Sequence, residues 1–380
     1  MKKQSSTPHS YKRALGFASM IVLAALGLAP AAQGQTRSPT GRWALTGNLN
    51  QARDSHSASL LANGQVLVVG GISPSLTLID SAEIYDPASG AWSYTGSLVS
   101  KRYSQTSTTL INGQVLVAGG FGDVNIVASA EIYNPTAGTW MTTGSMETAR
   151  YLHTATLLTD GRVLVAGGET RSGKRFASAE IYDPGSGAWS AAASMHVARG
   201  DHAATLLGDG TVLVVGGGHA SNSRSVERYD PATDTWTTVG SLNTGRFGLT
   251  TTLLLSGKVL AVGGATGSGD VGPAELFDPV TNMWTNAGEL AHPRDSHTAI
   301  LQPNGKVIVT GGVGPDGVLL AAVEVFDPST RSFSPGGNLP VPCILHTATL
   351  LPDGQTLIAG GSSLFCGCGA IDTSQLGRAR

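Results

Sequence analysis

Pairs of adjacent glycines recur along the chain at an almost constant spacing. Successive pairs lie 47 to 49 residues apart, at Gly70-Gly71, Gly119-Gly120, Gly167-Gly168, Gly216-Gly217, Gly263-Gly264, Gly311-Gly312 and Gly360-Gly361. Tryptophan keeps the same period, at Trp43, Trp92, Trp140, Trp189, Trp236 and Trp284, and Phe333 takes the next place. A fixed period near 50 residues is typical of propellers and solenoids. The chain is therefore expected to repeat one structural unit seven times.

Within each repeat the sequence indicates four short strands. The first, such as residues 154–158, is followed by Asn-Gly or Asp-Gly in six of the seven repeats. These pairs favour tight hairpins because they adopt positive φ easily. The second strand runs into the glycine pair, and the fourth carries the tryptophan. The third begins at a Glu-x-aromatic-Asp/Asn-Pro motif, whose glutamates are Glu83, Glu131, Glu180, Glu227, Glu275 and Glu324.

The order of glycine pair, tyrosine and tryptophan resembles the kelch repeat over about residues 42–361. The resemblance implies an all-β, seven-bladed propeller of four-stranded antiparallel blades around a channel. Trp43 lies on a fourth strand that has no repeat before it, and residues 340–361 supply only the first two strands of a last blade. We expect the N-terminal strand around Trp43 to complete that blade and close the ring. Residues 369–376 are expected to supply its third strand, although they lack the motif.

The N-terminal segment has the pattern of a secretory signal. Lys2, Lys3, Lys12 and Arg13 precede an apolar run at 14–29, and small residues follow up to Gly34. The run is shorter than the ~20 residues that a membrane span needs. We expect residues 1–34 to be removed, leaving 35–380 as a single propeller domain of seven repeats. The mature protein would be secreted or periplasmic, with no membrane span.

Three cysteines, Cys343, Cys366 and Cys368, fall in the last repeat. Cys343 begins an expected first strand, and the other two follow a second strand antiparallel to it. All three are therefore expected at the same face of one blade. Because thiols of exported proteins usually pair, we expect a disulfide between Cys343 and either Cys366 or Cys368.

An arginine precedes the first strand in six repeats, at Arg53, Arg102, Arg150, Arg199, Arg246 and Arg294. Six arginines around a channel mouth would suit an anion. However, each arginine starts a strand at the same face as the motif glutamate, and the glycine pair between them has no side chains to block their approach. The last repeat has Cys343 at the arginine position and also lacks the glutamate. We therefore expect structural Arg–Glu pairs.

Residues that differ between repeats are the candidates for a ligand-binding face. The kelch resemblance implies that the fourth-to-first connections and the second-to-third loops emerge on one face. On these segments lie Tyr103, Tyr151, Phe247, Phe121, Arg171, Lys174, Arg175 and Phe176. Four of them, Tyr103, Tyr151, Phe121 and Phe176, are expected to form one apolar rim with the three cations beside it. The alternative is that the rings only fill the connections between blades.

Five histidines share the position three residues after the arginine position: His56, His153, His202, His297 and His346. A position repeated around a ring indicates packing or hydrogen bonding within each blade, whereas metal ligands must converge on one point. We expect no metal site and no cofactor. No Ser-His-Asp arrangement, Gly-x-Ser-x-Gly motif or P-loop identifies an active site.

We expect an exported binding module that holds a protein or a glycan on its loops, rather than an enzyme. Kelch propellers also include enzymes, so the alternatives are a cofactor-free, sugar epimerase-like enzyme and a galactose oxidase-like copper enzyme. The copper enzyme needs a Tyr–Cys cross-link, and the early repeats contain no cysteine. A structural or adhesion role in the cell envelope is a third class. The net charge of −2 gives no support for a nucleic-acid partner.

Overall fold

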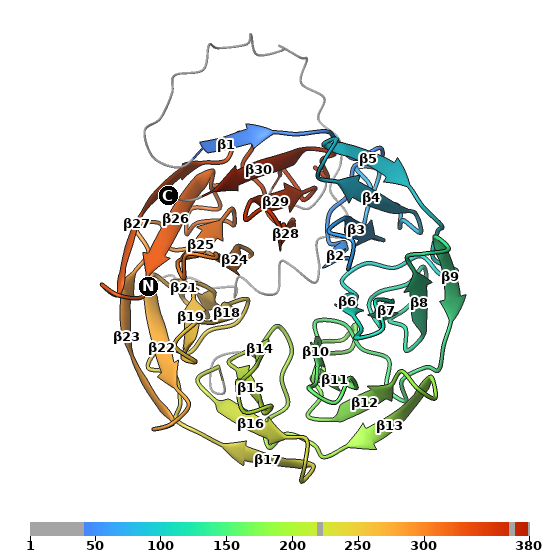
Figure 1. Cartoon of the computed structure of the whole chain (residues 1–380). Coiled ribbons are helices and arrows are strands. Elements are labelled where there is room, and N and C mark those ends of the chain that lie inside the picture. The colour runs from blue at the N-terminus through green and yellow to red at the C-terminus, as the bar shows by residue number, and fades with distance from the viewer. Residues whose placement is uncertain (1–41, 219–222, 365–368, 379–380) are drawn as a thin grey trace, which may run out of the picture.

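A computed structural model describes residues 42–218, 223–364 and 369–378, which form a ring of seven blades around a central axis (Figure 1). Each blade is a four-stranded sheet whose neighbouring strands run antiparallel. No helix in this part of the chain is long and apolar enough to cross a membrane. The all-β, seven-bladed propeller expected from the repeats is confirmed.

The inner two strands of each blade form a hairpin close to the axis (Figure 1). The first strands are β2 (Ser57–Leu60), β6 (Thr106–Thr109), β10 (Thr154–Leu157), β14 (Ala203–Leu206), β18 (Thr250–Leu253), β24 (Thr298–Leu301) and β28 (Thr347–Leu350). The second strands are β3 (Val66–Val69), β7 (Val115–Ala118), β11 (Val163–Ala166), β15 (Val212–Val215), β19 (Val259–Val262), β25 (Val307–Thr310) and β29 (Thr356–Ala359). Every turn between them has a glycine with φ between +79° and +88°, which explains the Asn-Gly and Asp-Gly pairs.

The outer two strands complete each sheet. The third strands are β4 (Ala82–Asp86), β8 (Ala130–Asn134), β12 (Ala179–Asp183), β16 (Val226–Asp230), β22 (Pro273–Asp278), β26 (Ala322–Asp327) and β30 (Ser374–Arg378). The fourth strands are β5 (Ala91–Tyr94), β9 (Thr139–Thr142), β13 (Ala188–Ala192), β17 (Thr235–Thr238), β23 (Met283–Glu289), β27 (Ser332–Asn338) and β1 (Arg42–Leu45). A short ribbon of β20 (Ala265–Thr266) and β21 (Gly269–Asp270) extends one loop of the fifth blade.

The two ends of the chain share the last blade, whose strand order is β1-β30-β29-β28. Ring closure by the N-terminal strand around Trp43 is therefore confirmed. The third strand of this blade, expected within residues 369–376, begins only at Ser374 and ends at Arg378, because its pairing with β29 starts at Ser374 opposite Ala359.

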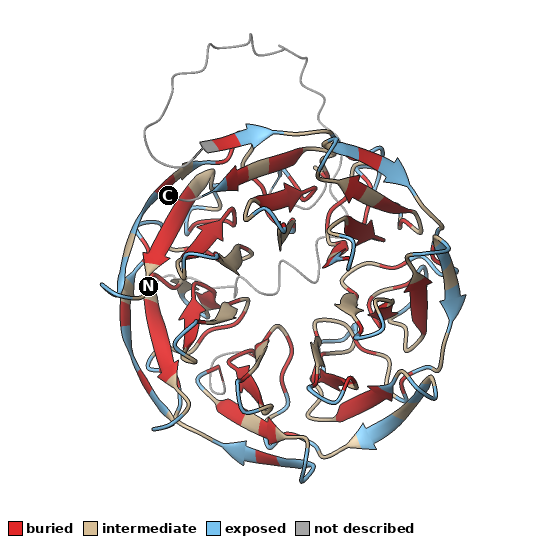
Figure 2. Cartoon of the chain, in the orientation of Figure 1, coloured by how far each residue is buried: buried red, intermediate tan, exposed pale blue. Residues whose placement is uncertain are grey.

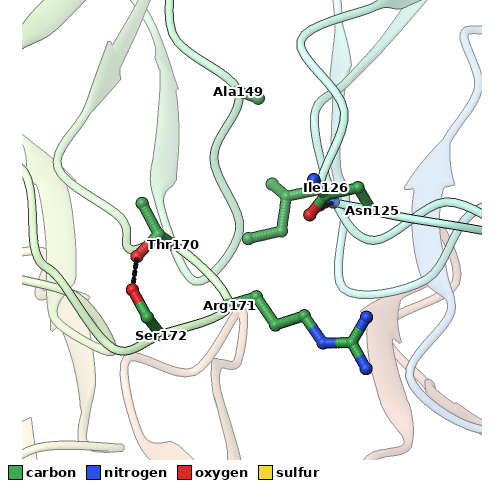
Figure 3. A pocket seen from close by; sticks show the side chains of 6 residues that line it. All are labelled: Asn125, Ile126, Ala149, Thr170, Arg171 and Ser172. Carbon is green, nitrogen blue, oxygen red and sulfur yellow. Dashed lines mark hydrogen bonds between the residues drawn. The ribbon is translucent and has the colours of Figure 1, made fainter.

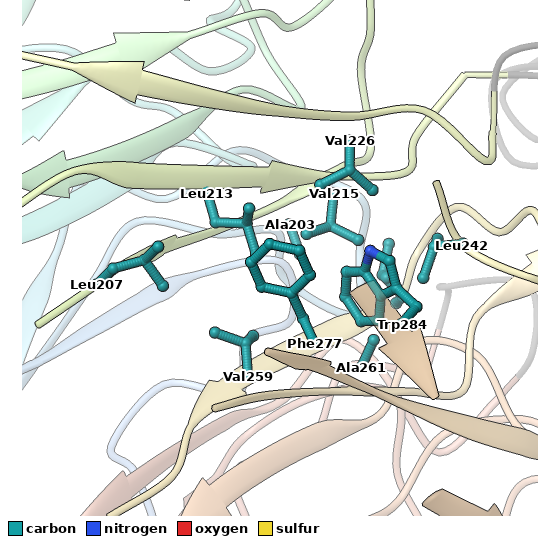
Figure 4. Close-up of a cluster of buried hydrophobic side chains, with 11 residues drawn as sticks. Ala203, Leu207, Leu213, Val215, Val226, Leu242, Val259, Ala261, Phe277 and Trp284 are labelled. Carbon is teal, nitrogen blue, oxygen red and sulfur yellow. The ribbon is translucent and has the colours of Figure 1, made fainter. Parts of the chain in front are cut away.

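The hydrophobic core lies between neighbouring blades. All residues of the second strands except Thr310 and Thr356 are apolar, and the second strands are buried throughout. The fourth strands are mostly exposed apart from their aromatic residue (Figure 2). In one such layer, Leu213 and Val215 of the fourth blade pack with Val259, Phe277 and Trp284 of the fifth (Figure 4). Each blade therefore depends on its two neighbours for burial of its apolar faces.

Candidate ligand-binding face

The connection that enters each blade meets the second-to-third loop of the same blade. The residue after the arginine position pairs through its backbone with the residue after the glycine pair, at Asp54 and Ile72, Tyr103 and Phe121, Tyr151 and Glu169, Phe247 and Ala265, Asp295 and Val313, and Ile344 and Ser362. Both sets of segments therefore emerge on one face of the ring. We call this surface the loop face.

Buried Arg–Glu ion pairs lie beneath the loop face in six blades. In the first blade, Arg53 Nη2 lies 2.8 Å from Glu83 Oε1, and both side chains are fully buried. Arg53 Nη1 also donates to the backbone carbonyls of Gly70 and Ser81, each at 2.9 Å. The other five pairs, at 2.7–2.8 Å, are Arg102–Glu131, Arg150–Glu180, Arg199–Glu227, Arg246–Glu275 and Arg294–Glu324. Since the guanidinium groups are occupied by protein acceptors, they do not form an anion site at the channel mouth.

The glutamate of each pair also holds the connection that enters its blade. Glu83 accepts hydrogen bonds from the backbone N–H groups of Asn50 at 2.7 Å and Gln51 at 3.0 Å. Burial lowers the pKa of Arg53, and the nearby Glu83 carboxylate opposes that shift. The ion pair is therefore a fixed support for the loops above it.

The last blade replaces this ion pair with two neutral side chains. Cys343 stands at the arginine position, is fully buried, and packs with Val323 and Leu339. Gln375 stands at the glutamate position, where its Oε1 accepts the Val341 N–H at 2.9 Å and its Nε2 donates to the Val341 carbonyl at 3.0 Å. The amide thus keeps the backbone contact without needing a cation.

The expected disulfide stays a prediction, because Cys366 and Cys368 lie outside the described residues. As a free thiol Cys343 would be inert, since burial raises its pKa to about 12.

The five repeated histidines form side-chain hydrogen bonds between neighbouring blades, so the expectation of hydrogen bonding within each blade was wrong. Packing within the blade, the other expected role, is present, as where His153 lies against Gly168. His153 Nε2 lies 3.1 Å from Thr106 Oγ1 on the first strand of the preceding blade. The same bond, at 2.9–3.0 Å, joins His56 to Thr347, His202 to Thr154, His297 to Thr250 and His346 to Thr298. The contact crosses blades because the first strands lie side by side around the axis. Within the described residues, no three histidine, cysteine or acidic side chains gather as a metal site.

Three aromatic rings gather where the second and third blades meet on the loop face. Tyr103 stacks on Phe121 with ring centroids 5.2 Å apart and an interplanar angle of 28°. Tyr151 meets Phe121 edge-on at 6.0 Å and 89°. All three rings are half-buried. We call Tyr103, Phe121 and Tyr151 the aromatic cluster.

Arg171 extends the aromatic cluster with a cation. Its Cζ lies 5.5 Å from the centroid of Phe121, within the range of a cation–π contact. The side chain is exposed and reaches from the third blade toward the loop of the second. The aromatic cluster and Arg171 together make a partly apolar surface with a charged edge.

The two remaining aromatic candidates, Phe176 and Phe247, do not contact the aromatic cluster in the same way. Phe176 lies under the buried Arg150, whose Cζ is 5.5 Å from the ring centroid, and its backbone pairs with Arg199. Phe247 is only 5% exposed. Phe247 therefore fills the interior, whereas Phe176 is half-buried but packs with Arg150 instead of with the aromatic cluster.

Glu169 belongs to the face although no sequence pattern had singled it out. Tyr151 donates its hydroxyl to Glu169 Oε1 at 3.1 Å, and Arg175 Nε lies 3.5 Å from the other carboxylate oxygen. Burial raises the pKa of Glu169, and the hydrogen bond from Tyr151 and the charge of Arg175 oppose that shift. Comparison of the repeats could have identified Glu169, because it is the one acidic residue at the position after the glycine pair.

A shallow depression of about 480 Å³ opens beside Arg171, between the loops of the second and third blades. Its lining residues are Asn125, Ile126, Ala149, Thr170, Arg171 and Ser172 (Figure 3). The hydroxyl groups of Thr170 and Ser172 are hydrogen-bonded to each other at 2.9 Å. The Arg171 side chain extends past Asn125 and Ile126. The depression thus combines hydroxyl and amide groups, a small apolar wall and one guanidinium.

The seven blades and the loop face define a β-propeller of the kelch type. Residues 153–361, more than half of the chain, match the family model described as the KLHDC2/KLHL20/DRC7 Kelch-repeats domain. Residues 55–98 and 102–147 match the kelch motif. The chain belongs to the kelch-repeat family.

Two solved structures share the architecture. A fungal alcohol oxidase of the AA5 family, in complex with copper, is 19% identical with a TM-score of 0.74, over 90% of this chain and 76% of that one. A protein described as YjhT is 15% identical with a TM-score of 0.61, over 76% of this chain and 99% of that one. At these identities the likeness shows the fold alone. No curated protein matches the chain.

Proposed function

We propose that the chain is an interaction module that holds a protein partner on its loop face, over the second and third blades. The observation that carries this proposal is the half-buried aromatic cluster with Arg171 above it. Rigid aromatic rings give large contact area at little cost in conformational entropy, and aromatic residues and arginine are enriched where partners bind. Kelch propellers commonly serve as protein-interaction modules.

The cluster is supported from below, which suits a preformed binding surface. Glu169 fixes the hydroxyl of Tyr151, and the Arg150–Glu180 pair holds the connection on which Tyr151 lies. A surface that is already ordered loses less entropy when a partner binds. The rings at this place also differ from blade to blade, so they are free of the repeat's own structural requirements.

A selection experiment tests the proposal. A display library of random linear peptides is selected on the full chain, and the bound peptides are mapped by hydrogen exchange. Protection confined to segments 121–127 and 170–176 supports the proposal. Protection elsewhere, or no selected peptide at all, contradicts it.

A glycan is the second candidate ligand, because exposed aromatic rings beside hydroxyl groups also suit sugars. A glycan array probed with the same protein separates the two. Binding to a defined glycan, lost when Tyr103 and Tyr151 are changed to alanine, would replace the protein partner by a carbohydrate.

Export forms part of the same proposal. It rests on the basic and apolar segments at 1–34, which precede the described residues. Sequencing the N-terminus of protein recovered from the native cell tests it. A first residue near Gln35 is expected, whereas an intact Met1 in the mature protein would contradict export.

A further inference from the structure

Most arginine and lysine side chains in the described part of the chain have an acidic partner. The six buried arginines pair within their blades, and surface pairs such as Arg162–Asp160, Lys258–Asp278 and Lys306–Asp327 hold the outer loops. Five described cations form no ion pair with a described acid: Lys101, Arg171, Lys174, Arg224 and Arg331. Charges without a partner are therefore the exception in this chain.

Three of these five cations lie on the loop face of the second and third blades. Lys101 precedes Arg102, and its carbonyl lies against Gly122 at the start of the second blade's loop. Arg171 and Lys174 lie on the third blade's loop, and all three side chains are exposed. Cations on neighbouring loops do not stabilise the folded state, because their mutual repulsion is unfavourable.

The guanidinium of Arg171 is presented in a defined way. The face of Phe121 lies 5.5 Å beneath its Cζ, and Nη1 lies 3.5 Å from the carbonyl of Val124. A guanidinium held over a ring keeps the N–H groups along its edge for an acceptor, and two parallel N–H groups match a carboxylate. The hydroxyls of Thr170 and Ser172 stand beside it, and because they are bonded to each other, one of their two O–H groups is left as a further donor.

Acids on the same segments are few. Glu169 is engaged by Tyr151 and Arg175, and the loops themselves carry the exposed Asp123 and Glu147. Neither of these two loop acids forms an ion pair with Lys101, Arg171 or Lys174. Burial raises the pKa of Tyr103 and Tyr151, and the charges of Asp54 and Asp201, on the connections that enter the first and fourth blades, raise it further. The three cations without an ion pair are therefore a local feature of the second and third blades, in a chain whose net charge is −2.

From this placement we infer that the loop face recognises an acidic peptide segment, with a side-chain carboxylate on Arg171 and an apolar side chain on the aromatic cluster. The inference rests on the proposed function and names the chemistry of the partner. Lys174 and Lys101 attract the segment from a distance, whereas Arg171 makes the direct contact. The depression lined by Asn125, Ile126 and Ala149 takes the residue next to the carboxylate.

The test uses poly-L-glutamate as the probe, with polygalacturonate and poly-L-lysine in parallel, on the full chain. We expect poly-L-glutamate to bind, more weakly as salt rises, and to lose about tenfold in affinity or more in Arg171→Glu and Lys174→Glu. Arg331→Glu is the matched control, because it makes the same charge change at an unpaired cation on the turn after β26. Equal weakening in the control, or no binding of poly-L-glutamate, overturns the inference.

Two further results sharpen the outcome. Polygalacturonate binding that depends on Arg171, without binding of poly-L-glutamate, overturns the inference in favour of an acidic sugar. Peptides selected on the loop face should be rich in Asp and Glu, and changing those residues to Lys should be rescued by Arg171→Glu. Selected peptides that depend on the aromatic cluster but carry no acidic residue would leave the proposed function standing and overturn this inference alone.

Discussion

The indole of Trp43 lies directly against the α-carbon of Gly377, its partner across the pairing of β1 with β30. A Cβ at position 377 would overlap the indole ring. In the first blade the same position is Tyr85, whose ring centroid lies 5.1 Å from that of Trp92. In the closing blade, Gly377 therefore replaces the tyrosine of the repeat, and the indole of Trp43 occupies the space that the tyrosine ring would take. Trp43 Nε1 also donates to the Gly336 carbonyl of the preceding blade at 3.2 Å, which ties the seam to its neighbour.

Restoring the tyrosine of the repeat should weaken the seam. We expect Gly377→Tyr to lower the free energy of unfolding by about 1–3 kcal/mol, the usual effect of overpacking a filled site. Urea unfolding measures the change. Adding Trp43→Ala to Gly377→Tyr should recover part of the loss, and a fully stable Gly377→Tyr would contradict the packing seen at the seam.

Removing one member of a buried ion pair should cost far more than removing both charges. Arg150→Met leaves the Glu180 carboxylate buried without a cation, so we expect a loss of about 3–5 kcal/mol in unfolding free energy. Arg150→Met with Glu180→Gln should be more stable than the single variant, because Gln375 already works beside a neutral residue in the last blade. Arg162→Met breaks an exposed pair and serves as the control, with an expected cost below about 1 kcal/mol. A double variant no more stable than the single one would contradict this account.

The interblade histidines should make the protein sensitive to acid. Burial, assisted by nearby arginines for most of them, lowers the pKa of His56, His153 and His297 to about 3 and that of His346 to about 4, and it also lowers the pKa of His202. The unfolded chain binds these protons near pH 6.5, so the stabilising contribution is complete above that pH. It is lost as pH falls from about 6.5 toward 3, at up to about 1.4 kcal/mol per pH unit for each histidine.

Position 105 offers a matched variant for this prediction. Gln105 takes the histidine position in the second blade, and its Nε2 donates to Ser57 Oγ at 3.2 Å and to the Val69 carbonyl at 2.8 Å. His153→Gln should therefore keep its bond to Thr106 while removing one titrating group. Denaturant unfolding between pH 4 and 7 should show a slope smaller by about one proton. An unchanged slope would show that His153 is not neutral in the folded protein.

The number of free thiols tests the disulfide expected in the last blade. If Cys343 bonds to Cys366 or Cys368, protein denatured without reductant should show one free thiol, and reduction should raise the count to three. Three free thiols before reduction would rule the disulfide out. The bridge would strengthen the blade that lacks the Arg–Glu pair.

The repeat made most of the fold predictable from the sequence. The contacts between blades and those of the variable loops were not, because they depend on more than one repeat. The glycine pairs, turns and orphan Trp43 strand determine the blade number and the closure, because each repeat must pair within its own sheet. The contact of Arg53 with Glu83 follows from the place of both residues at strand ends. The histidine bonds could not be assigned to the right partner, because one repeat does not show how first strands meet between blades. Glu169 occupies a repeated position, but the repeat does not show that its carboxylate reaches Tyr151. Phe176 lies on a loop without periodicity, so only the folded loop shows that it lies beneath Arg150.

The affinity of a loop-face ligand for a variant with Tyr103→Ala and Tyr151→Ala tests the central claim most directly. A peptide selected on the intact protein is titrated into this variant and into Tyr94→Ala, which removes a tyrosine 57% exposed on an outer strand. We expect the double variant to lose at least ~2 kcal/mol of binding free energy, about 30-fold, with a melting temperature close to that of the parent protein. Unchanged affinity together with a lowered melting temperature would show that the rings only pack between blades, and would contradict the claim.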